Sequence, residues 1–214
     1  ASSELVIGQE AGGTLGVIVA DKFGNLAAGV QSAGLGHGTG VVVEGLGFTA
    51  TSMIQFGDRN SDYIWAVKGG AKVPITIAPI LVMKDGKPWA GMGSGGTETI
   101  LQGPVQIIMN MVDFEMTPQD AVEAPRFAAR GTWADPPGQP GKFELHRNNQ
   151  MYLEVVGDIN YKTALDLANR GHYIYAFEAP AGSVGGYSLI VIDPETGTFF
   201  GAADIRRQNY AIGW

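Results

Sequence analysis

The stretch Thr14-Leu-Gly-Val-Ile-Val-Ala-Asp-Lys-Phe-Gly-Asn-Leu-Ala-Ala-Gly-Val-Gln-Ser32 holds two short apolar runs on either side of a turn. The first run, Leu15–Ala20, has the apolar character of a short buried strand. The segment Asp21–Asn25 contains residues that are typical of turns, among them glycine. The chain then returns over Leu26–Gln31. Two such runs joined by a turn that contains glycine predict a β-hairpin.

Further strands and helices are expected downstream of this hairpin. Apolar segments at 79–83 and 88–92 flank an Asp-Gly turn, which predicts a second hairpin. Helical spacing of apolar residues predicts a helix over 100–114, and the Thr117-Pro start predicts another that ends at Pro125. The other expected elements are a strand at 41–43, a Pro/Gly loop at 131–142, a helix at 163–170 closed by Gly171, and strands at 186–192 and 198–202. This order predicts an α+β domain with two sheets and helices packed outside them.

The composition describes one globular domain with an unusual amount of glycine. The chain has 214 residues, of which 45% are hydrophobic and 16% charged, so it is long and apolar enough to bury a core. Glycine occurs 32 times, which is about twice its average usage. Because these glycines follow no Gly-X-Y period, a collagen-like chain is excluded. We expect them at tight turns and where backbone approaches another group closely.

Several classes of partner and site are not expected. The net charge of −7 means that the chain lacks the excess of basic residues that bind the phosphate backbone of nucleic acid. The absence of cysteine excludes disulfides and thiolate metal sites. No apolar run reaches the length of a membrane helix, and the first ten residues do not resemble a signal peptide. The three histidines, His37, His146 and His172, are too scattered to suggest a metal site. None of these features identifies a cellular compartment.

A glycine-rich segment, Gly91-Met-Gly-Ser-Gly-Gly96, allows two functional readings and one structural reading. It contains a G-x-G-x-x-G match with Asp113 roughly 20 residues further on, as in a dinucleotide-binding fingerprint. That fingerprint needs a βαβ unit, whereas a second helix is expected at Thr117 in place of the second strand. Alternatively, the successive N–H groups of such a turn could hold an oxyanion during acyl transfer. A plain strand-to-helix turn remains the structural alternative.

Several separate motifs, in order, resemble the small subunit of the γ-glutamyltranspeptidases. The resemblance covers nearly the whole chain from Thr14 onward. The motifs that carry it are Lys72-Val-Pro74, Ala78-Pro-Ile80, Lys84-Asp-Gly-Lys87, Gly93-Ser-Gly-Gly96, Asp113-Phe114, Met116-Thr-Pro-Gln-Asp-Ala-Val-Glu-Ala-Pro-Arg-Phe127, Gly201-Ala-Ala-Asp-Ile-Arg-Arg207 and Gly213-Trp214.

The resemblance implies an N-terminal-nucleophile (Ntn) hydrolase fold, a four-layer αββα sandwich. Such proteins are made as one precursor that cuts itself. Residues 1–13 would then be a pre-nucleophile segment and residues 14–214 the small-subunit domain. A large subunit from the same precursor would complete the sheets and supply part of the pocket, including any carboxylate-binding arginine. No metal or organic cofactor is implied.

The resemblance also assigns catalytic roles. Thr14 stands seven residues before the Asp21-x-x-Gly-Asn25 turn, as the family's nucleophile does, and the preceding Gly12-Gly13 leaves room for self-cleavage. A free N-terminal Thr supplies a hydroxyl nucleophile and, in its α-amine, the base that activates it. Ser32 matches a hydroxyl that hydrogen-bonds the nucleophile, and Gly95 and Gly96 match the oxyanion-hole pair. The implied chemistry is attack on a small-molecule amide, an acyl-enzyme, and release to water or an amine.

The chain departs from the family where the glutamyl head group is held. Gln55 replaces an acidic residue, Thr51-Ser52 replaces an Asn-rich segment, Gly34 replaces an Asn, and Ile75-Thr76 replaces a Ser-Ser pair. The candidate substrate-binding residues are therefore Gln55, Ser52 and Thr76. Loss of a carboxylate removes a charge-assisted bond to an ammonium group, so we expect a substrate without a γ-glutamyl head or one that presents it differently.

Two further departures concern the catalytic apparatus. Ser94 stands where the family usually has Pro before Gly-Gly, which bears on the geometry of the oxyanion hole. Thr14 follows thirteen residues, so its amine is held in a peptide bond. The chain is then an uncut or miscut form, or one cut upstream at Ala1. Ser2 and Ser3 are alternative hydroxyls near that terminus, but neither lies in the sequence context of the family's nucleophile. A catalytically silent scaffold or binding subunit that never frees Thr14 is the alternative function.

Overall fold

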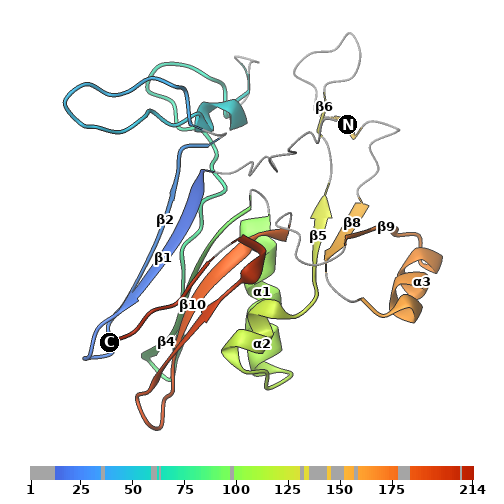
Figure 1. The fold of residues 1–214 in the computed structure, drawn as a ribbon. Coiled ribbons are helices and arrows are strands. Elements are labelled where there is room, and N and C mark those ends of the chain that lie inside the picture. Colours follow the sequence, from blue (N-terminus) through green and yellow to red (C-terminus); the bar gives the residue numbers. More distant parts are fainter. Residues whose placement is uncertain are drawn as a thin grey trace, which may run out of the picture.

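The computed structural model describes residues 13–34, 37–58, 62, 64–96, 99–130, 133–134, 144–145, 152–156, 159–177, 184–207 and 209–214 (Figure 1). Three α-helices lie in this part of the chain: α1 (Thr99–Val112), α2 (Pro118–Glu123) and α3 (Tyr161–Asn169). The strands are β1 (Thr14–Ala20), β2 (Leu26–Ser32), β3 (Ile80–Lys84), β4 (Lys87–Gly95), β5 (Arg126–Arg130), β6 (Trp133–Ala134), β7 (Glu144–Leu145), β8 (Tyr152–Val156), β9 (Tyr173–Phe177), β10 (Gly186–Ile192) and β11 (Phe199–Ala203). Two 3-10 turns, η1 (Met53–Phe56) and η3 (Ile205–Arg207), complete the described elements. This mixture of helices and strands confirms the α+β class.

The first predicted hairpin is confirmed as the antiparallel pair β1–β2. The pairing runs from Thr14 opposite Ser32 to Ala20 opposite Leu26. Asp21 fixes the turn, because its carboxylate accepts hydrogen bonds from the backbone N–H groups of Phe23 and Asn25 and from the Asn25 side chain. The Asn25 bonds, from its side chain and then its backbone, lower the pKa of Asp21. The hairpin therefore places Thr14 and Ser32 side by side at its open end.

Glycines let this hairpin lie directly against a second sheet. That sheet has the strand order β11-β10-β4-β3 and is antiparallel throughout. A Cβ on Gly16 of β1 would come within 2.4 Å of the Gly93 carbonyl carbon in β4. A Cβ on Gly91 would come within 3.0 Å of Ile18 Cγ2. Part of the glycine excess is thus explained by the close contact between β1 and β4.

The opposite face of the four-stranded sheet packs on α1 and α2. The buried cluster here joins residues of β4, β10 and β11 to residues of both helices, namely Ala90, Met92, Ile107, Ala121, Val122, Tyr187, Leu189, Val191 and Ala202. In Figure 1 the hairpin lies on one side of β4 and β10 and the two helices lie on the other. The described elements therefore stack as hairpin, four-stranded sheet and helix pair, in agreement with the expected two sheets with helices outside.

Three expectations need correction. Residues 41–43 form no strand, since Val42 makes only an isolated bridge to Thr49. A sheet of order β5-β8-β9 was not expected, and its β8–β9 pair is parallel. The expected loop at 131–142 contains β6, and its other residues, like residues 1–12 and His146, lie outside the described part of the chain. No helix in the described ranges is both long and apolar enough to span a membrane.

Candidate active site

Thr14 and Ser32 form the centre of the candidate site. Their Oγ1 and Oγ atoms are 2.8 Å apart, and both side chains are partly buried. Ser32 Oγ also accepts a hydrogen bond from the Gly34 N–H at 3.0 Å. The register of the hairpin produces this contact, because Thr14 opens β1 directly opposite the last residue of β2. The predicted pairing of nucleophile and supporting hydroxyl is therefore present in the geometry.

Gly95, at the end of β4, lies against Thr14. A Cβ on Gly95 would come within 2.8 Å of the Thr14 carbonyl oxygen and 3.2 Å of Thr14 Cβ. The same point is 3.2 Å from Nη1 of Arg207, so a guanidinium also lies beside this backbone. Ser94, which replaces the usual proline, donates its hydroxyl to the Gly95 carbonyl at 2.7 Å. Only a residue without a side chain fits here while the backbone stays close to Thr14.

Gly96 turns the chain from β4 toward α1. Its φ of +143° lies in the region that favours glycine, and a Cβ would come within 2.3 Å of Thr99 Oγ1 and 2.8 Å of Gly185 Cα. The Gly96 carbonyl accepts from both the N–H and the hydroxyl of Thr99. Its carbonyl is therefore directed to the first turn of α1, and Thr99 fixes the orientation of the Gly96 carbonyl.

A buried ionic network lies behind this loop. Arg126 pairs with Asp204, and it donates to the Gly185 carbonyl at 3.2 Å. Burial lowers the pKa of Arg126, while the Asp204 carboxylate opposes that shift. Arg206 Nη1 lies 3.2 Å from Asp204 Oδ1. Arg126 is therefore a buried structural anchor, and Asp204 pairs with both Arg126 and Arg206.

Tyr187 connects the same network to the start of α1. Its hydroxyl donates to the Thr99 carbonyl at 2.6 Å, and the Arg126 guanidinium lies 4.8 Å from its ring centre. Burial raises the pKa of this tyrosine. Sequence reasoning did not identify Tyr187 or Thr99 as part of the site, because only the folded sheet brings β10 next to the end of β4.

The predicted substrate-binding residues all lie in the part of the chain between β2 and β3. Ser52 lies next to the end of β2, since its N–H donates to the Ala33 carbonyl at 2.8 Å. Gln55 is exposed in η1, and Thr76 is partly buried in the irregular segment before β3. None of the hydrogen bonds recorded for the described residues joins Gln55 or Thr76 to Thr14. The hydrogen bonds of the described residues thus connect Ser52 to the residue after Ser32, and Gln55 to Ser52, whose carbonyl accepts from the Gln55 N–H at 3.0 Å.

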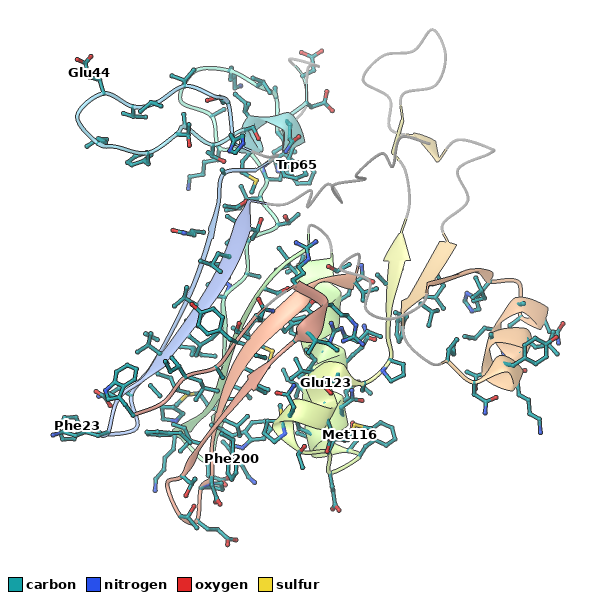
Figure 2. The ribbon with its side chains drawn as sticks, viewed as in Figure 1. Phe23, Glu44, Trp65, Met116, Glu123 and Phe200 are labelled. Atoms are coloured by element: carbon teal, nitrogen blue, oxygen red, sulfur yellow. The ribbon has the colours of Figure 1, made fainter. Side chains whose placement is uncertain are left out.

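The loops that carry these residues lie at the open end of the hairpin. In Figure 2 Phe23 marks the turn end, whereas Glu44 and Trp65 lie at the opposite end, near the start of β1. The described residues of this region contain no group of three His, Asp or Glu side chains placed to hold a metal ion. The G-x-G-x-x-G match lies in antiparallel β4 rather than in a βαβ unit, which leaves the dinucleotide reading without its structural context.

Comparison with known families decides the assignment of the chain. Residues 3–214 match the family model described as Gamma-glutamyltranspeptidase. The chain belongs to the γ-glutamyltranspeptidase family. This membership confirms the resemblance inferred from the sequence motifs. The matched range includes all the site residues from Thr14 to Arg207.

Two curated members of the γ-glutamyltranspeptidase family illustrate the relationship. The acylase ACY 1 proenzyme of Pseudomonas sp. (strain SE83) is 29% identical over 205 residues, covering 96% of this chain and 33% of that protein. The glutathione hydrolase proenzyme of Bacillus subtilis (strain 168) is 27% identical over 209 residues, covering 94% of this chain and 31% of that protein. The chain thus spans about a third of the length of these relatives.

Solved structures of γ-glutamyltranspeptidase relatives share the fold. Cephalosporin acylase from Bacillus halodurans superposes with a TM-score of 0.71 at 26% identity, covering 88% of this chain and 32% of that chain. A mutant γ-glutamyltranspeptidase from Helicobacter pylori gives a TM-score of 0.71 at 20% identity, covering 89% of this chain and 98% of that one. At that identity the second likeness establishes the fold alone.

Proposed function

We propose that this chain is the catalytic part of an amidohydrolase or acyltransferase in which Thr14 is the nucleophile. The observation that carries the proposal is the 2.8 Å contact between Thr14 Oγ1 and Ser32 Oγ, made where the Gly95 backbone lies against Thr14. A nucleophile held by a second hydroxyl, beside backbone that can supply N–H donors, is the arrangement that acyl transfer requires.

The proposed reaction has two stages. With Thr14 at a free N-terminus, its α-amine takes the hydroxyl proton as Oγ1 attacks the amide carbonyl, and the N–H groups of Gly95 and Gly96 hold the oxyanion. Collapse breaks the C–N bond, the amine proton passes to the leaving group, and an acyl-Thr14 ester remains. Water or an acceptor amine then attacks the ester and restores the Thr14 hydroxyl. The steps need neither a metal nor an organic cofactor.

The proposal includes self-cleavage of a precursor between Gly13 and Thr14. Residues 1–13 would then precede the nucleophile and residues 14–214 would form the small-subunit domain. The printed names of both curated relatives describe them as proenzymes, which supports processing in this family. The alternative, a silent scaffold or binding subunit, would keep the Gly13–Thr14 bond intact.

A large subunit would complete the structure, including the fourth layer of the αββα sandwich. Two exposed apolar surfaces support this partner. The outer face of β1 exposes Leu15, Val17 and Val19, each by about half of its surface. The face of α1 away from the sheet exposes Leu101, Val105, Met109 and Val112 to a similar extent. Contiguous apolar surface of this kind marks an interface.

We propose an amide substrate that lacks the γ-glutamyl head group or presents it differently. Gln55, Ser52 and Thr76 occupy the family positions for that group, and Gln55 cannot pair with an ammonium as a carboxylate does. One of the curated relatives is named an acylase and another a glutathione hydrolase, so the family name alone does not choose the acyl group.

Steady-state kinetics of the complete processed protein tests this proposal. The kcat/KM for a γ-glutamyl anilide is compared with that for simple acyl anilides of similar length. We expect the simple amides to be preferred, and a Gln55→Glu variant to shift the preference toward the γ-glutamyl compound. High efficiency on the γ-glutamyl anilide in the parent protein would contradict the proposed substrate, although not the Thr14 mechanism.

A further inference from the structure

The carbonyl group of Gly13 is held by β2. The Ala33 N–H donates to the Gly13 oxygen at an N···O distance of 3.1 Å. This bond extends the β1–β2 ladder one residue beyond the Thr14–Ser32 pair, so the carbonyl group of the peptide that joins Gly13 to Thr14 has a fixed position. The bonded oxygen belongs to the carbonyl that Thr14 would attack during the proposed self-cleavage.

We propose that the Ala33 N–H is the oxyanion donor for cleavage of the Gly13–Thr14 bond. The inference rests on the proposed function of Thr14 and adds a group that acts in processing. As Thr14 Oγ1 attacks the Gly13 carbonyl carbon, negative charge develops on the oxygen that already accepts the Ala33 N–H. A donor fixed in a sheet ladder needs no reorganisation as that charge forms.

Self-cleavage of the Gly13–Thr14 bond needs water as its one additional reactant. The Oγ1–C bond forms, the C–N bond breaks, and the Oγ1 proton passes to the departing amine of Thr14. The product is an ester between Gly13 and the Thr14 side chain, which water hydrolyses to a Gly13 carboxylate and a free Thr14 hydroxyl. The Ala33 N–H stabilises the tetrahedral intermediate of the first step.

The Ala33 N–H, proposed for self-cleavage, comes directly after β2, whereas the Gly95 N–H, proposed for turnover, belongs to β4. Ala33 directly follows Ser32, whose Oγ accepts from the Gly34 N–H and contacts Thr14 Oγ1. Gly95, in contrast, approaches from β4 and lies against the carbonyl oxygen and Cβ of Thr14. Ser32 at the end of β2 and Ala33 directly after it therefore hold both reacting groups of the precursor, the hydroxyl through Ser32 and the carbonyl through Ala33.

The test removes the N–H while it keeps the side chain. In the full-length precursor, Ala33 is replaced by its ester analogue, lactic acid, through nonsense suppression, and cleavage is followed by intact mass. The loss of one oxyanion donor is expected to slow cleavage by about 100-fold. Ala33→Val keeps the N–H and is expected to cleave within a few-fold of the parent, and a melting curve of the uncut ester precursor shows whether it is folded.

Hydroxylamine identifies the step that is slowed. It cleaves the Gly13–Thr14 ester formed after the first step, so it should not restore the rate at which the Ala33 ester variant releases a chain that begins at Thr14. It also cuts the backbone ester at position 33, and intact mass separates that product from the chain that begins at Thr14. A folded ester variant that cuts at the parent rate, or one that hydroxylamine restores, would overturn the inference. A parent precursor that stays uncut would defeat the Thr14 proposal itself, and this inference with it.

Discussion

Thr14 and Ser32 face each other at the open end of the β1–β2 hairpin, with their side-chain oxygens 2.8 Å apart. The turn at the other end fixes this relationship, because Asp21 bonds to Phe23 and Asn25 and so sets the register of the whole pair. A shift of one residue would turn the Ser32 side chain to the other face of the hairpin. The contact between Thr14 and Ser32 thus depends on a turn that is encoded close to both residues in sequence.

The first prediction concerns Ser32. Ser32→Ala removes the hydroxyl that contacts Thr14, and we expect both precursor cleavage and turnover to fall about fivefold, since a neutral hydrogen bond contributes about 1 kcal/mol. Ser32→Thr keeps the hydroxyl and should retain most of the rate. The measurement is cleavage by intact mass, with kcat on the processed protein. Equal rates for the two variants would show that the hydroxyl contact has no role.

The second prediction concerns Gly95. Gly95→Ala would place a Cβ 2.8 Å from the Thr14 carbonyl oxygen, so the backbone at the nucleophile has to move. We expect kcat to fall by at least tenfold, because misplaced reacting groups lose rate steeply. Gly29→Ala, in β2 of the hairpin, meets no atom within 4 Å and serves as the control. Parallel kinetics of the two variants check the prediction, and similar kcat values would argue against a close fit at Gly95.

The third prediction concerns the Arg126–Asp204 pair, in which both side chains are fully buried. Asp204→Asn leaves the Arg126 charge buried without its counter-charge, and we expect a loss of about 3–5 kcal/mol in the free energy of unfolding. The matched control is Asp166→Asn in the exposed Asp166–Arg170 pair, where the loss should stay below about 1 kcal/mol. Denaturant unfolding of both variants measures the difference. A small effect at Asp204 would mean that the network contributes little to stability.

The fourth prediction concerns Tyr187 and alkaline pH. Burial raises the pKa of Tyr187, so the folded state favours the protonated phenol. The stabilisation that this shift contributes is fully present below about pH 10, the pKa of tyrosine in the unfolded chain. It is lost as the pH rises from there through the higher pKa of Tyr187 in the folded state. Tyr187→Phe should cost about 1–3 kcal/mol at neutral pH, because the Thr99 carbonyl loses its donor, and should flatten the alkaline decline. Melting curves from pH 8 to 11 test this, and an unchanged decline in the variant would contradict it.

The sequence predicted the parts of the fold that depend on neighbouring residues. Both hairpins and the α1 and α2 helices follow from turns and periodicity within short segments, whereas the pairing of Thr14 with Ser32 was implied by the family resemblance. The β5-β8-β9 sheet was missed because its parallel β8–β9 pair joins segments on either side of α3, and no local pattern specifies that pairing. The strand expected at 41–43 is apolar but exposed, and its partner segment supplies only one bridge.

The residues of the candidate site were predicted in part, but most of the contacts between them were not. Gly95 and Gly96 were assigned from the family resemblance, and their steric need for glycine follows from contacts with Thr14, Thr99 and Gly185 that only the fold creates. Gln55 and Thr76 were aligned with family positions, and the structure places Gln55 in the exposed turn η1 and Thr76 in the irregular segment before β3. The Ala33 N–H could not be found from residue type, because a backbone donor is available at almost every position.

The most direct test of the account is the N-terminus of the small chain. The full-length precursor and its Thr14→Ala variant are expressed in parallel and analysed by intact mass and N-terminal sequencing. We predict that the parent yields a chain beginning at Thr14 and that Thr14→Ala stays uncut at this bond. A parent that remains joined at Gly13–Thr14, or a Thr14→Ala variant that is cut there, would contradict the proposal that Thr14 is the nucleophile.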